Sequence, residues 1–129
     1  MAEDIENLPN CVKSLKEKYG KFSGMAYCAG VVGLNSLKAI TYEYAKKIFD
    51  INYFSPLMMI KGIADKRNNI GKGTSIVCIS SAGILFGTKG VNIYEGSKGA
   101  LYASIKAILK EITLLGMRIN TLLPSMTAT

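Results

Sequence analysis

Three short apolar segments alternate with three longer segments of helical periodicity, and this alternation constrains the fold more than any other feature. The short segments fit strands of a buried parallel sheet: 25–29, 75–79 and 118–123. The longer segments carry apolar residues at steps of three and four: 9–19, 41–63 and 94–115. Such alternation is typical of right-handed βαβ units. The sequence therefore predicts one α/β domain over residues 1–129, a partial Rossmann-like, doubly wound parallel sheet of three strands with helices on both faces.

The composition excludes several kinds of functional site. None of the 129 residues is histidine, which rules out His-ligated zinc sites, Ser-His-Asp triads and Cys-His dyads, and we expect no metal. The formal net charge is +7, but the lysines are scattered and lack interleaved aromatic residues, so we expect no nucleic-acid partner. Solvated surface or binding of a nucleotide-sized anion explains the excess charge.

Three features bear on where the protein works. No apolar run approaches the length that spans a bilayer, so we expect no membrane association. The acidic start, MAEDIENLP, lacks the apolar region of a signal peptide. The three cysteines are far apart in apolar surroundings and are predicted to be reduced core residues: Cys11, Cys28 and Cys78. These features predict a cytoplasmic protein.

Tyr94 and Lys98 are four residues apart on the third predicted helix, so their side chains share one face. A nearby ammonium favours the phenolate form of a tyrosine, which suits a general acid or base. The spacing alone is weak evidence, because two other pairs repeat it: Tyr42 with Lys46, and Tyr102 with Lys106. Only Tyr94 opens its helix after a glycine-rich loop, so it is the candidate for proton exchange.

Ser80 and Ser81 follow the second predicted strand directly, upstream of Tyr94. Ligands of open parallel sheets bind beyond the carboxyl ends of the strands. Beside Tyr94, the Ser81 hydroxyl is predicted to donate a hydrogen bond to a substrate carbonyl oxygen and to stabilise the alkoxide that forms. The alternative is that Ser81 is only a turn residue.

Pro56 lies inside the second predicted helix and points to Asn52. Proline lacks the amide hydrogen that would have bonded the main-chain carbonyl of Asn52, so this carbonyl is freed and the helix is expected to kink. An ordered water within reach of Lys98 is one partner for the carbonyl. The alternative is a kink filled by solvent.

As a set, these residues resemble the short-chain dehydrogenase/reductases over essentially the whole chain. The resemblance rests on the following residues: Ala29-Gly30, Asn52, Ile79-Ser80-Ser81, Tyr94-Glu95-Gly96-Ser97-Lys98 and Arg118-Ile119-Asn120 with Pro124. It implies hydride transfer, dependent on NAD or NADP, between a small-molecule carbonyl compound and its alcohol.

The resemblance also implies a role for each candidate residue. Tyr94 would donate or accept the proton, and Ser81 would orient the carbonyl. Lys98 would favour the phenolate and bond the nicotinamide ribose, while the Asn52 carbonyl would hold a relay water. The residues that would line the cofactor are these: Ala29, Gly30, Ile79, Tyr94, Lys98, Pro124 and Thr129. A homo-oligomer would form through helices 41–63 and 94–115.

The sequence departs from the family pattern in two ways. The family motif Asn-Asn-Ala-Gly is Tyr27-Cys28-Ala29-Gly30 here, and its Pro-Gly is Pro124-Ser125. No strand with a glycine-rich turn precedes residue 20, so the pyrophosphate-binding turn is missing. The isolated chain is therefore expected to bind NAD(P)H poorly, and strand 25–29 to leave an open edge.

Two functions remain open at this stage. The first is a reductase whose lead substrate is a 3-oxoacyl carrier-protein thioester, with catalysis dependent on a missing nucleotide-binding half. The second is a non-catalytic association module that pairs through its helices. Neither the substrate nor the preference for NAD or NADP follows from the sequence, because the segments that determine them are absent.

Overall fold

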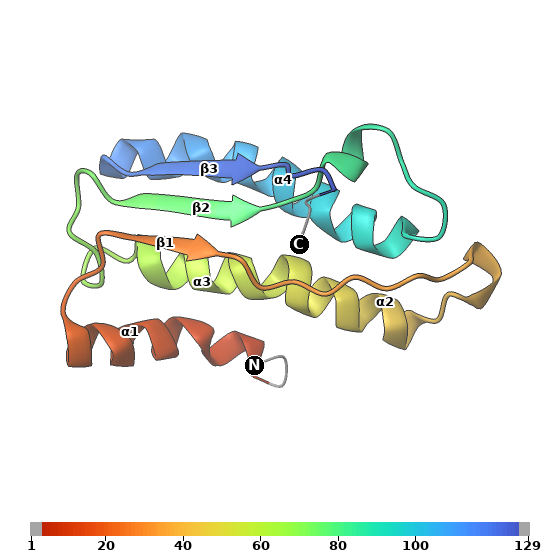
Figure 1. Ribbon diagram of the computed structural model, residues 1–129. Coiled ribbons are helices and arrows are strands. Elements are labelled where there is room, and N and C mark those ends of the chain that lie inside the picture. The colour runs from red at the N-terminus through yellow and green to blue at the C-terminus, as the bar shows by residue number, and fades with distance from the viewer. Residues whose placement is uncertain (1–3, 127–129) are drawn as a thin grey trace.

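The computed structural model describes residues 4–126 and contains one parallel sheet (Figure 1). Its strands are β1 (Gly24–Tyr27), β2 (Ser75–Ile79) and β3 (Arg118–Leu122). They lie in the order β1-β2-β3, and Met25, Ile76 and Ile119 share one row of the register. The three predicted strands are therefore present, although β1 ends at Tyr27, before the predicted end.

Helices connect the strands within residues 4–126. The α-helices are α1 (Leu8–Tyr19), α2 (Tyr42–Phe49), α3 (Ser55–Ala64) and α4 (Asn92–Ile112). Short 3-10 turns add η1 (Ile5–Asn7), η2 (Leu37–Ala39), η4 (Ala82–Leu85) and η5 (Thr113–Leu115). Gly116 follows η5 with φ of 74°, a left-handed conformation that ends the third predicted helix where glycine is favoured.

The second predicted helix, 41–63, is three elements instead of one. Between α2 and α3 lies a π-helical turn, η3 (Asp50–Phe54). The Ser55 backbone N–H donates to the Asp50 carbonyl, and the Ser55 hydroxyl donates to the same oxygen at 2.7 Å. Pro56, which lacks an N–H, follows at once, so the widened turn is the form that the expected irregularity takes.

The described helices cover one face of the sheet, so the prediction that both faces are covered is wrong for these residues. Side chains alternate between faces along a strand, and on β2 Ile76 and Cys78 are buried while Val77 is not. The buried core joins Ile76 and Cys78 to residues of α1, α3 and α4, and it includes no residue of the Val77 row. Right-handed crossovers that proceed in one direction along a sheet place their helices on the same side.

Gly62 allows α1 to pack closely against α3. A Cβ atom built on Gly62 would lie 2.9 Å from Val12 Cγ2 and 3.1 Å from Pro9 Cα. Val12 is buried in the core, where it meets Ile60 and Ile63 of α3. The approach of the two helices therefore requires glycine at this position.

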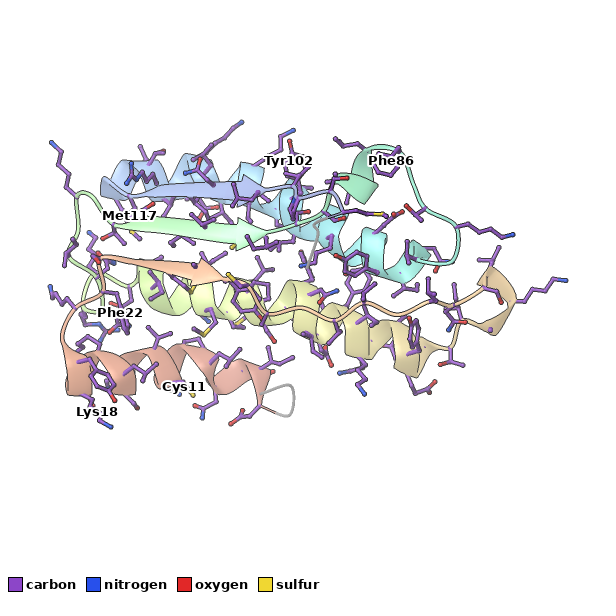
Figure 2. All side chains as sticks on the ribbon, viewed as in Figure 1. Cys11, Lys18, Phe22, Phe86, Tyr102 and Met117 are labelled. Carbon is purple, nitrogen blue, oxygen red and sulfur yellow. The ribbon has the colours of Figure 1, made fainter. Side chains whose placement is uncertain are left out.

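The cysteines differ from the prediction that all three are core residues. Cys78 is buried on β2, whereas Cys11 and Cys28 are exposed free thiols. Cys28 is exposed because β1 ends one residue earlier, and Cys11 lies on the outer side of α1 (Figure 2). Between residues 4 and 126, no helix has the length and apolar character needed to cross a membrane.

Candidate active site

The three strands point the same way, and the loops that follow β1 and β2 extend beyond their carboxyl ends (Figure 1). A cleft of about 610 Å³ opens there, and we call it the strand-end cleft. Its lining is Cys28, Gly30, Val31, Val32, Ile79, Ser80, Ser81, Gly83, Phe86, Thr88, Val91, Tyr94, Glu95, Lys98, Pro124, Ser125 and Met126. Figure 2 labels Phe86 on the segment that leads from β2 to α4. The cleft thus gathers segments that are far apart in the sequence.

Backbone hydrogen bonds fix the two strand exits that border this cleft. The Ser80 N–H donates to the Leu122 carbonyl at 2.8 Å, and the Ala82 N–H donates to the Pro124 carbonyl at 3.0 Å. The segment after β2 is therefore held against the segment after β3. This pairing sets the position of Ser81 relative to Pro124.

Lys98 brings a buried ammonium group to the cleft. The residue is 4% exposed, and its Nζ donates to the carbonyl of Ile79, the last residue of β2, at 2.8 Å. Burial lowers the pKa of this ammonium group, and the Cys78 thiol partly offsets the change. Within residues 4–126 this is the one hydrogen bond of the ammonium, so it has N–H groups left for a ligand.

Tyr94 presents its ring to the same cleft from the first turn of α4. Lys98 Nζ lies 5.9 Å from the centre of the Tyr94 ring. The pair of Tyr102 and Lys106 has similar geometry, at 5.5 Å, but neither residue lines the cleft. The spacing of tyrosine and lysine is therefore shared, and the cleft is what distinguishes Tyr94.

The two serines after β2 have different surroundings. Ser80 is buried, and its hydroxyl donates to the Lys98 main-chain carbonyl at 2.9 Å, which ties β2 to α4. Ser81 is the N-cap of η4, and its Oγ accepts a hydrogen bond from the Gly83 N–H at 3.1 Å. Because that bond uses a lone pair, the Ser81 hydroxyl proton is left to donate elsewhere.

Asn52 contributes through its side chain, a role that reasoning about its main-chain carbonyl missed. The residue is fully buried; its amide accepts from the Val31 N–H and donates to the Val31 carbonyl, both at 2.9 Å. It also donates to Ser97 Oγ at 3.0 Å. The amide thus holds the segment after β1 against α4, and the relay water on its main-chain carbonyl stays a prediction.

The space beside Gly30 bears on whether the nicotinamide half of the cofactor fits in the strand-end cleft. A Cβ atom on Gly30 would lie 3.2 Å from Lys98 Nζ and 3.3 Å from Asn52 Oδ1, so only glycine keeps the backbone open beside the ammonium. A flat ring with ribose hydroxyls needs such open backbone next to a donor, and these residues fit that half of the dinucleotide. Before β1, residues 4–23 contain no strand with a glycine-rich turn to hold the pyrophosphate.

Only some of the remaining predicted cofactor residues line the strand-end cleft. Ile79 and Pro124 line the strand-end cleft, while Ala29 is not among its lining residues. Thr129 lies outside the described residues. Glu95 lines the cleft beside Tyr94, although sequence reasoning gave it no role, and its contacts depend on loops that the sequence pattern does not position.

The parallel sheet with a cleft at its carboxyl ends defines an α/β protein of the class that binds ligands at that edge. A family model described as enoyl-(acyl carrier protein) reductase matches residues 2–129. The chain belongs to the short-chain dehydrogenase/reductase family, and the predicted partial Rossmann-like fold is confirmed.

Individual relatives match the chain at low identity. Galactitol 2-dehydrogenase of Agrobacterium fabrum is 23% identical over 94% of this chain and 47% of its own length. The vibriobactin-specific 2,3-dihydro-2,3-dihydroxybenzoate dehydrogenase of Vibrio cholerae is 29% identical over 92% of this chain and 45% of its own. A short-chain dehydrogenase of Burkholderia cenocepacia, solved in complex with NADP, has a TM-score of 0.86 and 21% identity, over 95% of this chain and 49% of that one. The chain spans about half the length of these relatives.

Proposed function

We propose that the strand-end cleft interconverts small-molecule carbonyl compounds and their alcohols, with NAD or NADP as the hydride carrier. The observation that carries this proposal is the buried Lys98 ammonium beside the Tyr94 ring, in one cleft with the free hydroxyl proton of Ser81. The Gly30 backbone leaves room beside the ammonium for the nicotinamide ribose.

In the reductive direction, the Ser81 hydroxyl donates a hydrogen bond to the substrate carbonyl oxygen and holds the carbonyl in place. The bound nicotinamide supplies the hydride to the carbonyl carbon. Tyr94 gives its phenolic proton to the oxygen, which leaves a phenolate and an alcohol. The Lys98 ammonium stabilises that phenolate by its charge, and oxidation of the alcohol runs through the same groups in reverse.

The preferred substrate class is a small alcohol or carbonyl compound. The family model is named for an enoyl reductase, whose substrate is an acyl carrier-protein thioester with a carbon–carbon double bond. The name supports the carrier-protein thioester of the 3-oxoacyl substrate, but not its ketone. The two curated relatives are named instead for galactitol and for 2,3-dihydro-2,3-dihydroxybenzoate. Both names describe compounds with hydroxyl groups on adjacent carbons, and this shared chemistry is the second line of support.

Two further properties belong to the proposal. Exposed apolar side chains of η3, α4 and η5 support a homo-oligomer that pairs through the helices: Phe54, Leu109, Leu114 and Leu115. The exposed free thiols of Cys11 and Cys28 fit a reducing compartment, which supports a cytoplasmic location.

The test is the oxidation of NADH or NADPH by the purified chain with acetoin as the acceptor, followed by absorbance at saturating cofactor. The chain alone is expected to turn over slowly, because residues 4–23 hold no pyrophosphate-binding turn, and faster when mixed with a separately expressed N-terminal nucleotide-binding half. Tyr94→Phe lowers kcat of the mixture by about a hundredfold or more because the proton donor is lost. The matched control is Tyr102→Phe, which removes the same hydroxyl group from the same helix outside the cleft.

Equal rates for Tyr94→Phe and the wild-type chain would contradict the assignment of the proton donor. A complete absence of turnover by the mixture with the nucleotide-binding half, for either nucleotide, would favour the non-catalytic association module. A fluorescence titration with NADH then separates loss of cofactor binding from loss of chemistry, and Lys98→Ala is expected to weaken that binding.

A further inference from the structure

Glu95 is the one carboxylate among the residues that line the strand-end cleft. It lies in the first turn of α4, directly after Tyr94. A carboxylate in a cleft that also holds the Lys98 ammonium and the Ser81 hydroxyl places a charged acceptor next to the reacting groups. The proposed reaction does not use this acceptor, so its presence needs another explanation.

The two oxygens of the Glu95 carboxylate face different groups. Oε2 accepts a hydrogen bond from the Thr88 N–H at 3.0 Å, which fixes the segment between η4 and α4. Oε1 faces Gly83, where an added Cβ would lie 2.5 Å from this oxygen and 3.3 Å from Ser81 Oγ. A Cβ on Gly83 would overlap Oε1, so the Glu95 carboxylate packs against the Gly83 backbone, on the same side as Ser81 Oγ.

We propose that Glu95 selects substrates that carry a hydroxyl group on the carbon next to the reacting carbonyl, which are α-hydroxyketones and the vicinal diols formed from them. This inference rests on the proposed function, because that function places the substrate carbonyl oxygen at Ser81. A hydroxyl on the adjacent carbon then lies near Oε1, and a carboxylate accepts its hydrogen bond with charge assistance.

The same carboxylate disfavours the competing substrate class. A 3-oxoacyl thioester presents a second carbonyl oxygen, which is an acceptor and finds no donor at Oε1. When this carbonyl oxygen faces Oε1 in a partly desolvated cleft, both acceptors lose their hydrogen bonds to water and gain none in return. Glu95 thus favours the hydroxyl-bearing class over the acyl class by both attraction and desolvation.

Glu95→Gln separates this selecting role from a purely structural one. The glutamine amide oxygen still accepts from the Thr88 N–H, so the segment stays in place, but the amide NH₂ then replaces Oε1 beside Gly83 as a donor. Hydrogen exchange at the Thr88 amide reports whether the first bond persists. Glu111→Gln is the matched control. Glu111 is exposed on the same helix, and its substitution removes the same negative charge.

The experiment measures binding of acetoin and of butanone, which lacks the hydroxyl, to the purified chain by saturation-transfer NMR. The wild-type chain and Glu111→Gln are expected to bind acetoin about tenfold more tightly than butanone, and Glu95→Gln is expected to lose this preference. Protection of the Thr88 amide stays near the wild-type level in Glu95→Gln.

A preference for acetoin that survives Glu95→Gln would overturn the inference, as would the absence of binding by either ligand. The loss of both the preference and Thr88 protection in Glu95→Gln would also overturn it, because the carboxylate would then act on the fold alone. Hydride transfer is measured separately with the same variants. If the wild-type chain prefers acetoin but transfers no hydride even when mixed with the nucleotide-binding half, the proposed function is contradicted, whereas the selecting role of Glu95 is not.

Discussion

The thiol of Cys78 lies on the buried face of β2, and its burial raises its pKa from 9.0 to about 11, although the Lys98 ammonium partly opposes the shift. The folded state therefore keeps the neutral thiol where the unfolded chain ionises. This stability is complete below pH 9 and is lost as the pH rises toward about 11. The expected loss is about 2 to 3 kcal/mol in the free energy of unfolding.

Urea denaturation between pH 8 and 11 measures this loss against that of Cys78→Ala. The alanine variant is less stable at every pH because it leaves a cavity, but its dependence on pH is expected to be flatter than that of the wild-type chain. Cys11→Ala, which removes an exposed thiol on α1, retains the wild-type slope. Parallel slopes for the wild-type chain and Cys78→Ala would contradict the shift.

At the residue scale, the sequence predicts which side chains reach the cleft. It predicts less well which groups those side chains form hydrogen bonds with. Ser81, Tyr94 and Lys98 were found because their positions follow from one strand end and one helix face. The contact of Asn52 with Val31 joins residues 21 positions apart, through a loop whose path no local pattern specifies. A fully polar amide in an apolar helix was the available signal for Asn52.

At the scale of the elements, the contact between α1 and α3 gives the sharpest prediction. Gly62→Ala is expected to destabilise the chain by about 1 to 3 kcal/mol, because the new methyl group would overlap Val12 and Pro9. The overlap outweighs the gain of about 1 kcal/mol in helix propensity. Gly99→Ala on α4 is the control, since its Cβ would meet only Ile84 Cγ2, at 4.0 Å, and it is expected to stabilise the chain.

The midpoint of urea unfolding, at an unchanged m-value, measures both glycine variants. A gain of stability in Gly62→Ala would show that the two helices separate at little cost. A loss in Gly99→Ala similar to that in Gly62→Ala would show that the chain tolerates no added methyl group on its helices, whatever the local space.

The bounds and types of the elements differ in how closely the sequence predicts them. Strand β2 matches the predicted 75–79 because a β-branched run between polar loops is a strong local signal. Pro56 indicated an irregular helix but not its kind, because a kink and a π-helical turn both accommodate the missing N–H. The end of β1 at Tyr27 was missed, since the apolar run continues past the last ladder residue.

At the scale of the whole molecule, the strand order explains why the helices share one face. The order β1-β2-β3 means that both crossovers proceed in the same direction, and right-handedness then fixes the covered side. The sequence contained this information once the strand order was assumed to follow the chain. The opposite face, which carries Asn120 and the 54% exposed Leu122, is open within residues 4–126.

Two surfaces therefore compete as the site of self-association, and the proposed oligomer uses the helices. Tyr53 joins η3 to α4 through a hydrogen bond between its hydroxyl and Ser104 Oγ at 3.1 Å, and its ring packs edge-on against Phe54 at 4.9 Å. Phe54 and Leu109 are exposed at 42% and 39%, so burial between two copies would remove apolar area from water. The open sheet face exposes Leu122 beside the polar Asn120.

Analytical ultracentrifugation of three chains distinguishes the two surfaces. The wild-type chain is expected to sediment as a dimer or larger oligomer, and Leu109→Lys is expected to weaken the association roughly tenfold or more, because a buried apolar contact becomes a desolvated charge. Leu122→Lys, the matched change on the open sheet face, leaves sedimentation unchanged. Dissociation caused by Leu122→Lys but not by Leu109→Lys would move the interface to the sheet, and a monomeric wild-type chain would exclude both.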